Sequence, residues 1–313
     1  MIEVYAPASI GNFAVGFDAL GAAIAPIDGT LLGDVVRISA SAETEFVCSG
    51  PYAHKLPQQA EQNLAFMCMA HFRATVAPDM PTARMELVKN LPIGSGLGSS
   101  ACSVVAALAA LNKFAGTELS EDALIELMAD FEAKVSGARH YDNITPCLLG
   151  GLQLTGALIP GRSLTIPTPS NWYPVVAFPG FTLNTAQART VLPQQMSLHH
   201  GIEFAQRLSA FCTLMHQQQH ELAMELMIDT VAEPYRSELI SGFSAAKKAV
   251  LELGAKAVSI SGAGPTLFAL CDNINDAKNC QQWLQQNYVN EQGFSHICQI
   301  DTAGTRVLNE GKE

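Results

Sequence analysis

The residues best suited to chemistry form a glycine-rich segment in the first third of the chain. The segment is Pro92-Ile93-Gly94-Ser95-Gly96-Leu97-Gly98-Ser99-Ser100, and it continues into the small residues Ala101 and Cys102. Glycines leave backbone N–H groups unobstructed, and the dipole of a following helix favours an anion at its start. The segment therefore predicts a phosphate site, with a tight turn of purely structural purpose as the alternative.

Two common phosphate motifs do not fit this segment. A P-loop requires a lysine after its last glycine, but Ser99 follows Gly98. A dinucleotide-binding fingerprint requires a third glycine at the position of Ser99. If the segment binds phosphate, it belongs to another class of phosphate loop.

The elements that must position this segment follow from apolar periodicity and helix-capping residues. Alternating apolar residues predict strands at 2–6, 36–40 and 85–88. Ser120 is a good N-cap and predicts a helix from that point. We also predict helices over 101–114, 203–228 and 243–253, and strands over 175–178, 257–260 and 266–270. The last two strands are joined by Ser261-Gly262-Ala263-Gly264-Pro265.

Length and composition predict a folded protein of two domains. The chain has 313 residues, and a domain has about 150. Residues 160–174 contain four prolines among serines and threonines, so we place the domains at 1–165 and 166–313. Apolar residues make up 48% and charged residues 15%, which excludes disorder as the main state. The net charge of −11 argues against nucleic acid and anionic membranes as partners.

The sequence also predicts a cytoplasmic location. The chain begins Met1-Ile2-Glu3-Val4-Tyr5, which has neither the basic start nor the apolar run of a targeting peptide. The longest apolar stretch, 101–111, is too short to cross a bilayer. Eight cysteines without a C-x-x-C pair argue against a zinc ribbon or a dithiol redox site and favour reduced thiols.

Four segments, taken in order along the chain, resemble the GHMP kinases, the superfamily of galactokinase and the homoserine, mevalonate and phosphomevalonate kinases. Within this superfamily the chain most resembles the homoserine kinases, and the resemblance spans residues 5 to about 270. The segments are Ser9-Ile10-Gly11-Asn12-Phe13-Ala14-Val15-Gly16-Phe17-Asp18, the glycine-rich segment, His140-Tyr141-Asp142-Asn143 followed by Gly150-Gly151, and Ser261-Gly262-Ala263-Gly264-Pro265-Thr266.

The resemblance implies an α+β fold of two domains with ATP and substrate in the cleft between them. The N-terminal domain would be ribosomal-S5-like, and the C-terminal domain a ferredoxin-like α/β sandwich. The implied reaction transfers the γ-phosphoryl group of ATP to the side-chain hydroxyl of L-homoserine, in threonine biosynthesis. A homodimer is expected as well.

The resemblance also assigns roles to individual residues. The glycine-rich segment, Ala101, Cys102 and Asn63 would bind ATP, and Ser100 and Glu132 would bind Mg²⁺, which prefers hard oxygen ligands. Arg189 and Arg236 would bind the substrate carboxylate. The remaining substrate contacts would come from Asp18 to the ammonium group, Asn12 and His140 to the hydroxyl, and Thr185, Gly262 and Gly264.

Two residues depart from the pattern of the relatives. Several GHMP kinases have an aspartate as base where this chain has Asn143, and an amide cannot accept the proton. We therefore expect catalysis by alignment of the hydroxyl and stabilisation of the phosphoryl group, with Asn12, Glu132, His140 and Asn143 as catalytic residues. Gly11 stands where many homoserine kinases carry alanine, a small-for-small change that leaves the resemblance intact.

Three other functions stay open on the sequence alone. One is a GHMP kinase for another small molecule such as mevalonate, and one is a paralogue that senses a nucleotide or an amino acid without catalysis. The third, a Rossmann oxidoreductase, is already weakened by Ser99.

Overall fold

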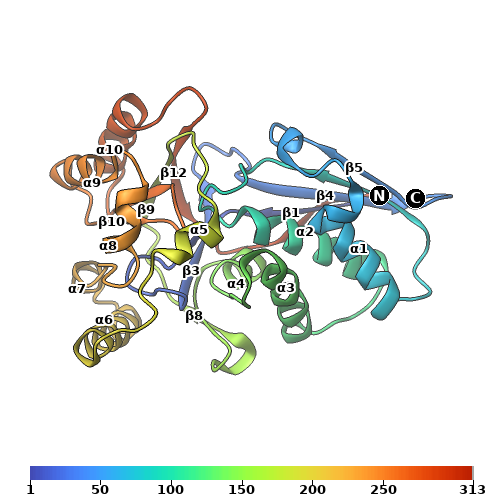
Figure 1. Cartoon of the computed structure of the whole chain (residues 1–313), viewed down its shortest axis with the longest axis horizontal. Helices are drawn as coiled ribbons and strands as arrows, with labels where there is room; N and C mark the ends of the chain where they lie inside the picture. The colour runs from blue at the N-terminus through green and yellow to red at the C-terminus, as the bar shows by residue number, and fades with distance from the viewer. Residues whose placement is uncertain (312–313) are drawn as a thin grey trace.

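The computed structural model describes residues 1–311, apart from the side chains of residues 135 and 136, and contains two β-sheets flanked by helices (Figure 1). The first sheet has the strand order β13-β1-β4-β6-β5. Its strands are β1 (Ile2–Pro7), β4 (Gly33–Ala40), β5 (Glu45–Ser49), β6 (Ala83–Val88) and β13 (Arg306–Glu310). The β5–β6 pair is parallel and the other pairs are antiparallel. Since β13 pairs with β1, the two ends of the chain lie side by side (Figure 1).

The second sheet joins strands from both halves of the chain. Its order is β10-β11-β9-β12-β3-β7-β8, with β2 paired to β3, and all its pairs are antiparallel. The strands are β2 (Ser9–Gly11), β3 (Leu20–Pro26), β7 (Leu152–Thr155), β8 (Ser163–Ile166), β9 (Tyr173–Phe178), β10 (Ala257–Ile260), β11 (Leu267–Cys271) and β12 (Phe294–Ile300). The domain division at 165 and 166 stays a prediction, and two strand pairs, β12–β3 and β13–β1, cross it.

Ten α-helices complete the described part of the chain. They are α1 (Leu64–Thr75), α2 (Ser99–Phe114), α3 (Glu121–Ser136), α4 (Ile144–Leu149), α5 (Thr185–Thr190), α6 (Leu198–His216), α7 (His220–Glu225), α8 (Glu233–Arg236), α9 (Phe243–Glu252) and α10 (Ile274–Asn287). Short 3₁₀ helices lie at Ala53–Lys55, Ala60–Gln62, Pro160–Arg162 and Ser237–Leu239.

Local sequence explains the elements that carry the site. In β6, buried Ala83, Met85 and Leu87 alternate with more exposed residues, so one face of the strand enters the core. Helix α2 packs on β1 and β4, and its many small residues allow that close approach. Helix α3 begins as predicted, because Ser120 accepts a hydrogen bond from the N–H of Ala123.

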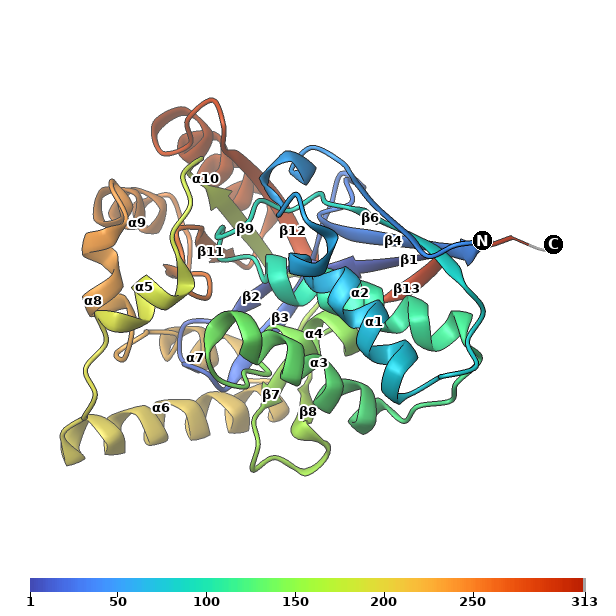
Figure 2. The ribbon, with the colours of Figure 1, turned by 45° about the vertical axis from the view of Figure 1, so that its right-hand side comes forward.

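The predicted helix over 203–228 is wrong in its extent. The structure has α6 and α7 instead, separated by the three glutamines Gln217 to Gln219. Gln218 takes a left-handed conformation (φ 59°), which ends the first helix. Helix α6 also starts earlier than predicted, because Ser197 caps it by accepting from the N–H of His200. Figure 2 shows α6 along an outer edge of the molecule.

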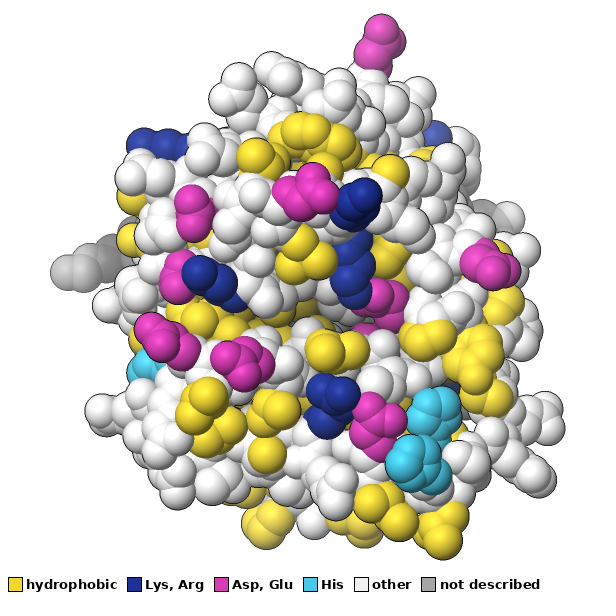
Figure 3. All heavy atoms as spheres, turned by 90° about the vertical axis from the view of Figure 1, so that its left-hand side faces the viewer, with side chains coloured by type: hydrophobic (Ala, Val, Ile, Leu, Met, Phe, Trp, Pro, Cys, Tyr) yellow, Lys and Arg dark blue, Asp and Glu magenta, His cyan; other side chains and the backbone are white. Residues whose placement is uncertain are grey.

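The surface over the C-terminal helices mixes acidic, basic and apolar side chains (Figure 3). The acidic excess of the chain is therefore not gathered on this face. Within residues 1–311, none of the helices combines the length and apolar character needed to cross a membrane.

Candidate active site

The glycine-rich segment forms a tight loop between β6 and α2. Gly94, Gly96 and Gly98 all have positive φ (68°, 83° and 67°), which side-chain-bearing residues rarely adopt. A Cβ on Gly98 would lie 2.3 Å from Ser9 Oγ, and one on Gly96 would lie 2.5 Å from Ser261 O. No described side chain caps the first turn of α2. The loop is therefore shaped by its glycines, and the N–H groups at the start of α2 are available to an anion.

The loop between β10 and β11 supports the glycine-rich loop from the other half of the chain. Ser261 Oγ donates to Gly96 O at 2.6 Å, and Thr266 Oγ1 donates to Ser95 O at 2.6 Å. Two of the four segments quoted from the sequence are thus in direct contact. The contact fixes the phosphate loop relative to the C-terminal half of the sheet.

A buried ion pair, which the sequence analysis missed, lies behind the first turn of α2. Lys89 Nζ lies 2.5 Å from Asp34 Oδ2 and donates to Ser99 O at 2.8 Å and to Ser103 Oγ at 2.9 Å. The side chains of Lys89 and Asp34 are almost fully buried. Removal of one partner would leave a buried charge unpaired, so the pair fixes the helix start strongly. Lys89 also lines the cleft described next.

A cleft of about 520 Å³ opens in front of the loop. It is lined by the loop and by parts of α1, α3 and α5. Of the residues predicted to bind ATP, Asn63, Ile93, Gly94, Ser95, Gly96, Gly98, Ser99, Ser100 and Ala101 line it. Pro92, Leu97 and Cys102 lie outside the lining. Cys102 is fully buried, and its Sγ donates to Ala6 O at 2.9 Å, on the side of α2 that faces β1.

Glu132 of α3 and Ser100 of α2 both line this cleft, as the predicted magnesium ligands. Burial raises the pKa of Glu132 to about 7, and the nearby Ser100 hydroxyl acts in the opposite direction. Ser100 Oγ is buried and makes no hydrogen bond of normal geometry among the described residues. A buried carboxylate beside a hydroxyl suits Mg²⁺, which keeps several waters and needs few protein ligands. The two residues therefore fit the ion.

A second cluster of polar residues brings Asp18, Arg189 and His140 together. Arg189 Nη2 lies 2.5 Å from Asp18 Oδ2, and His140 Nδ1 lies 3.6 Å from Asp18 Oδ1. Burial lowers the pKa of His140, with Asp18 acting in the opposite direction and the nearby arginines acting with burial. His140 Nε2 is buried and has no hydrogen-bond partner among the described residues. A neutral histidine is thus favoured, with one ring nitrogen available to a ligand.

Arg236 and Asn12 meet at the carbonyl oxygen of Gly262. Arg236 Nη1 donates to this oxygen at 2.9 Å, and Asn12 Nδ2 donates at 3.1 Å. Arg236 Nε donates to Ala188 O at 3.1 Å, while Asn12 Oδ1 accepts from the N–H of Asp18 at 3.0 Å. Gly262 lines the cleft. The cluster around Asp18 therefore joins the phosphate cleft through Gly262.

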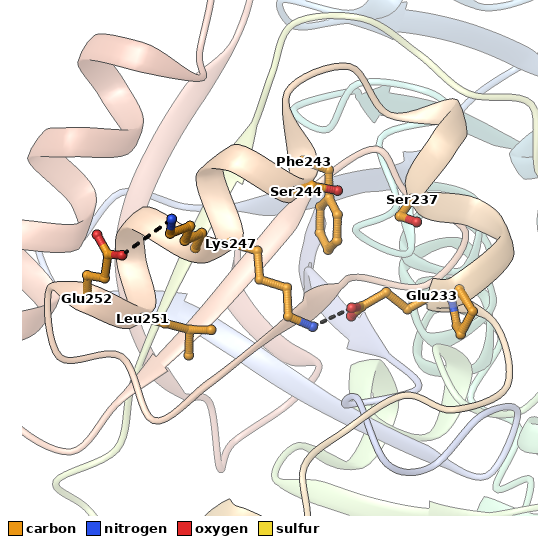
Figure 4. A pocket seen from close by; sticks show the side chains of 9 residues that line it. Glu233, Ser237, Phe243, Ser244, Lys247, Leu251 and Glu252 are labelled. Atoms are coloured by element: carbon orange, nitrogen blue, oxygen red, sulfur yellow. Dashed lines mark hydrogen bonds and ion pairs between the residues drawn. The ribbon is translucent and has the colours of Figure 1, made fainter.

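Helix α8, which carries Arg236, is anchored at two points. Asp229 Oδ1 accepts from the N–H of Ala232 at 2.7 Å and thereby holds the start of the helix. Glu233 pairs with Lys247 of α9 (Figure 4) and accepts from Ser259 Oγ of β10 at 2.8 Å. The anchoring side chains do not line the cleft. They hold the backbone from which Arg236 extends.

The segment with Asn12 has an unusual backbone that the sequence did not reveal. Asn12, Phe13 and Ala14 are consecutive residues with φ of 67°, 41° and 61°. Such conformations cost about 1–3 kcal/mol each and persist only where the surroundings enforce them. Phe13 is fully buried, and its ring stacks on Phe268 and Trp172 at centroid distances of 5.6 and 6.2 Å. Packing from the C-terminal half thus holds Asn12 in place.

Comparison with known proteins agrees with this geometry. Residues 63–151 match the family model described as GHMP kinases N terminal domain, and residues 203–290 match GHMP kinases C terminal. A crystal structure of homoserine kinase from Cytophaga hutchinsonii is 31% identical, with a TM-score of 0.88 over 98% of this chain and 97% of that one. The chain belongs to the GHMP kinase family.

More distant structures share the fold of this GHMP kinase. A candidate homoserine kinase from Listeria monocytogenes is 21% identical, with a TM-score of 0.74 over 99% of this chain and 100% of that one. The mevalonate kinase of L. major in complex with R-mevalonate is 16% identical, with a TM-score of 0.69 over 95% and 94% of the two chains. The predicted two-domain α+β fold is confirmed. As a GHMP kinase, the protein is a phosphotransferase that uses ATP.

Asn143, where several GHMP kinases have an aspartate, is held at the end of the cleft. Its Oδ1 accepts from Ser9 Oγ at 2.9 Å, and its Nδ2 donates to Asp142 Oδ2 at 3.2 Å. Asp142 is buried, which raises the pKa of its carboxyl to about 7. A Cβ on Gly11 would lie 2.6 Å from Asp142 Oδ2 and 2.9 Å from Asn143 Nδ2. An alanine at position 11 of this chain would therefore displace both side chains.

Of the two remaining residues predicted to contact the substrate, one lines the cleft and one does not. Thr185 is exposed at the start of α5 and lines the cleft. Gly264, with φ of 86°, shapes the loop after β10 and lies outside the lining.

Proposed function

We propose that this GHMP kinase phosphorylates the side-chain hydroxyl of L-homoserine with ATP, forming O-phospho-L-homoserine, a step of threonine biosynthesis. The observation that carries the proposal is the cluster of Asp18, Arg189, Arg236 and His140 beside the phosphate cleft. Homoserine has one ammonium, one carboxylate and one hydroxyl group, and the cluster offers a complement to each. The 31% identity to a homoserine kinase supports the same substrate.

The contact between Arg189 and Asp18 indicates how the zwitterion is received. In the absence of a substrate the two side chains neutralise each other at 2.5 Å. A bound homoserine replaces this pair, with its ammonium on Asp18 and its carboxylate on Arg189. Arg236 has five N–H donors and uses two on Ala188 and Gly262, so the others are free for the same carboxylate.

The transfer itself requires mainly alignment. The hydroxyl oxygen of homoserine forms a bond to the γ-phosphorus as the bond to the bridging oxygen breaks and ADP leaves. Asn12, His140 and Asn143 orient the hydroxyl, and its proton leaves with the phosphate or to solvent. Ser100 and Glu132 would hold Mg²⁺, which neutralises phosphate charge when bound. Asn143 cannot act as a base, so no side-chain base is assigned.

A coupled ADP-release assay with homoserine, serine, threonine and mevalonate tests the proposal. We expect the highest kcat/KM with homoserine. Mevalonate has no ammonium group for Asp18, so preferred turnover of mevalonate would contradict the proposal. Tight ATP binding without turnover of any acceptor would instead support a sensor.

We also propose that the enzyme is cytoplasmic and homodimeric. Its low content of charged side chains, 15%, is compatible with an apolar interface between copies. Light scattering on the purified protein measures the oligomeric state, and a monomeric mass would contradict the dimer.

A further inference from the structure

A single aromatic ring lies against both arginines of the proposed homoserine site. The Cζ atoms of Arg189 and Arg236 are 5.8 and 5.5 Å from the centroid of the Phe17 ring. An aromatic face attracts a cation within about 6 Å of its centroid. Phe17 directly precedes Asp18. Two adjacent residues therefore supply an aromatic face to both arginines and a carboxylate to Arg189.

The two guanidinium groups differ in their other partners. Arg189 has the carboxylate of Asp18 at 2.5 Å. The side chain of Arg236 is buried, and the hydrogen bonds that its described surroundings give it go to two neutral carbonyl oxygens. Burial lowers the pKa of Arg236 and the charge of Arg189 acts with burial, while the carboxylates of Asp229, Asp18 and Asp142 act in the opposite direction. The buried guanidinium group of Arg236 and the partly exposed one of Arg189 thus lie on the same ring.

We propose that Phe17 is a positioning residue for the carboxylate of the acceptor, because its ring holds both guanidinium groups ready to receive one anion. The ring stabilises the two cations and leaves their hydrogen-bond donors unoccupied. A second carboxylate in its place would accept hydrogen bonds from those donors. Phe17 therefore sets the preference for acceptors that carry a carboxylate. This inference rests on the proposed homoserine site.

Fluorination of the ring separates this role from simple packing. Mono-, di- and trifluorophenylalanine at position 17 keep the shape of the side chain while weakening the negative face of the ring. We expect the KM for homoserine to rise with each fluorine, while kcat and the KM for ATP stay within about twofold. Phe17→Leu should raise the KM for homoserine about fivefold, a value typical of partly exposed cation–π contacts.

Two controls accompany the series. The aminopropanol that lacks the carboxylate of homoserine should be a poor acceptor whose turnover does not respond to the changes at Phe17. Phe114→Leu alters a half-buried phenylalanine at the far end of α2, about 22 Å of helix from Ser99, and should change neither KM. A homoserine KM that does not respond to fluorination would overturn the proposal.

A measurement without substrate separates failure of this inference from failure of the proposed function. A double-mutant cycle in urea unfolding compares Phe17→Leu, Arg236→Met and the double variant. If the two side chains interact, the change in the unfolding equilibrium constant of the double variant should differ from the product of the two single changes by about twofold or more. A double variant whose change equals the product of the two single changes would contradict an energetic contact between Phe17 and Arg236, whichever acceptor the enzyme uses. If the wild type does not phosphorylate homoserine but the deviation is found, the proposed substrate is wrong, while the interaction of the Phe17 ring with Arg236 is supported.

Discussion

Replacement of Arg236 by lysine tests the proposed carboxylate site most directly. The change keeps the positive charge and removes the planar fork. Arg236 donates through Nε to Ala188 O and through Nη1 to Gly262 O, and the proposal assigns its remaining donors to the substrate carboxylate. A lysine ammonium group carries three donors on one nitrogen and cannot reach two separate carbonyls and a carboxylate in the same way.

The magnitude follows from the hydrogen bonds at stake. Arg236→Lys should cost at least one charge-assisted hydrogen bond to the carboxylate, which is worth about 1.5–3 kcal/mol. That corresponds to a rise of about 10- to 150-fold in the KM for homoserine. Arg236 does not line the phosphate cleft, so the KM for ATP should change by less than about twofold.

Steady-state kinetics with each substrate varied in turn measure both constants. The matched control is Arg207→Lys on α6, the helix at an outer edge of the molecule (Figure 2), where Arg207 pairs with Glu203 at 3.0 Å. It should leave both constants unchanged. Equal losses for homoserine and ATP in Arg236→Lys would refute the assignment, because they would mean a general distortion of the site.

Three further variants test other parts of the site. Glu132→Gln should lower kcat about a hundredfold with little change in homoserine KM, and an unchanged rate at saturating magnesium would remove Glu132 from the metal site. Asp142 has a pKa raised from 3.8 to about 7, so its contribution to stability is lost as pH rises from about 4 to about 7. Asp142→Asn should therefore flatten the urea-unfolding stability over that range and keep turnover, whereas loss of turnover with intact binding would make Asp142 a base. Lys247→Met removes the partner of Glu233 and should raise homoserine KM a few-fold, while Lys248→Met, at an exposed pair with Glu252, should not. Equal effects of the two lysine variants would contradict the anchoring of α8.

The parts of the fold that were predictable depend on short-range signals. Ser120 marks the start of α3 through its own hydrogen bond to Ala123. The phosphate loop could be predicted because glycine is the residue that adopts positive φ without a steric cost, and Gly94, Gly96 and Gly98 follow one another at alternate positions. The helix over 203–228 was mispredicted because apolar residues continue on both sides of Gln218, and nothing local showed that the chain would turn there.

The parts that were not predictable depend on contacts between distant segments. Lys89 is an ordinary lysine in the sequence, and only its contact with Asp34, 55 residues away, makes it part of the helix start. The left-handed turn at Asn12 likewise depends on Phe13 packing against Trp172 and Phe268. A resemblance can give such a residue a role, but the physical reason for its position appears only when the distant partners are known.

The net negative charge of the chain and the local groups at the cleft affect a bound anion over different distances. A net charge of −11 is screened beyond about 8 Å at physiological ionic strength, so it mainly affects extended polyanions that approach a large part of the surface. At the cleft, the N–H groups at the start of α2 are available to an anion, and beside the cleft two arginines lie on the ring of Phe17. Because these local groups are close to the site and held in place by the fold, they outweigh the distant acidic surface. A chain with this net charge can therefore repel nucleic acid and still bind ATP.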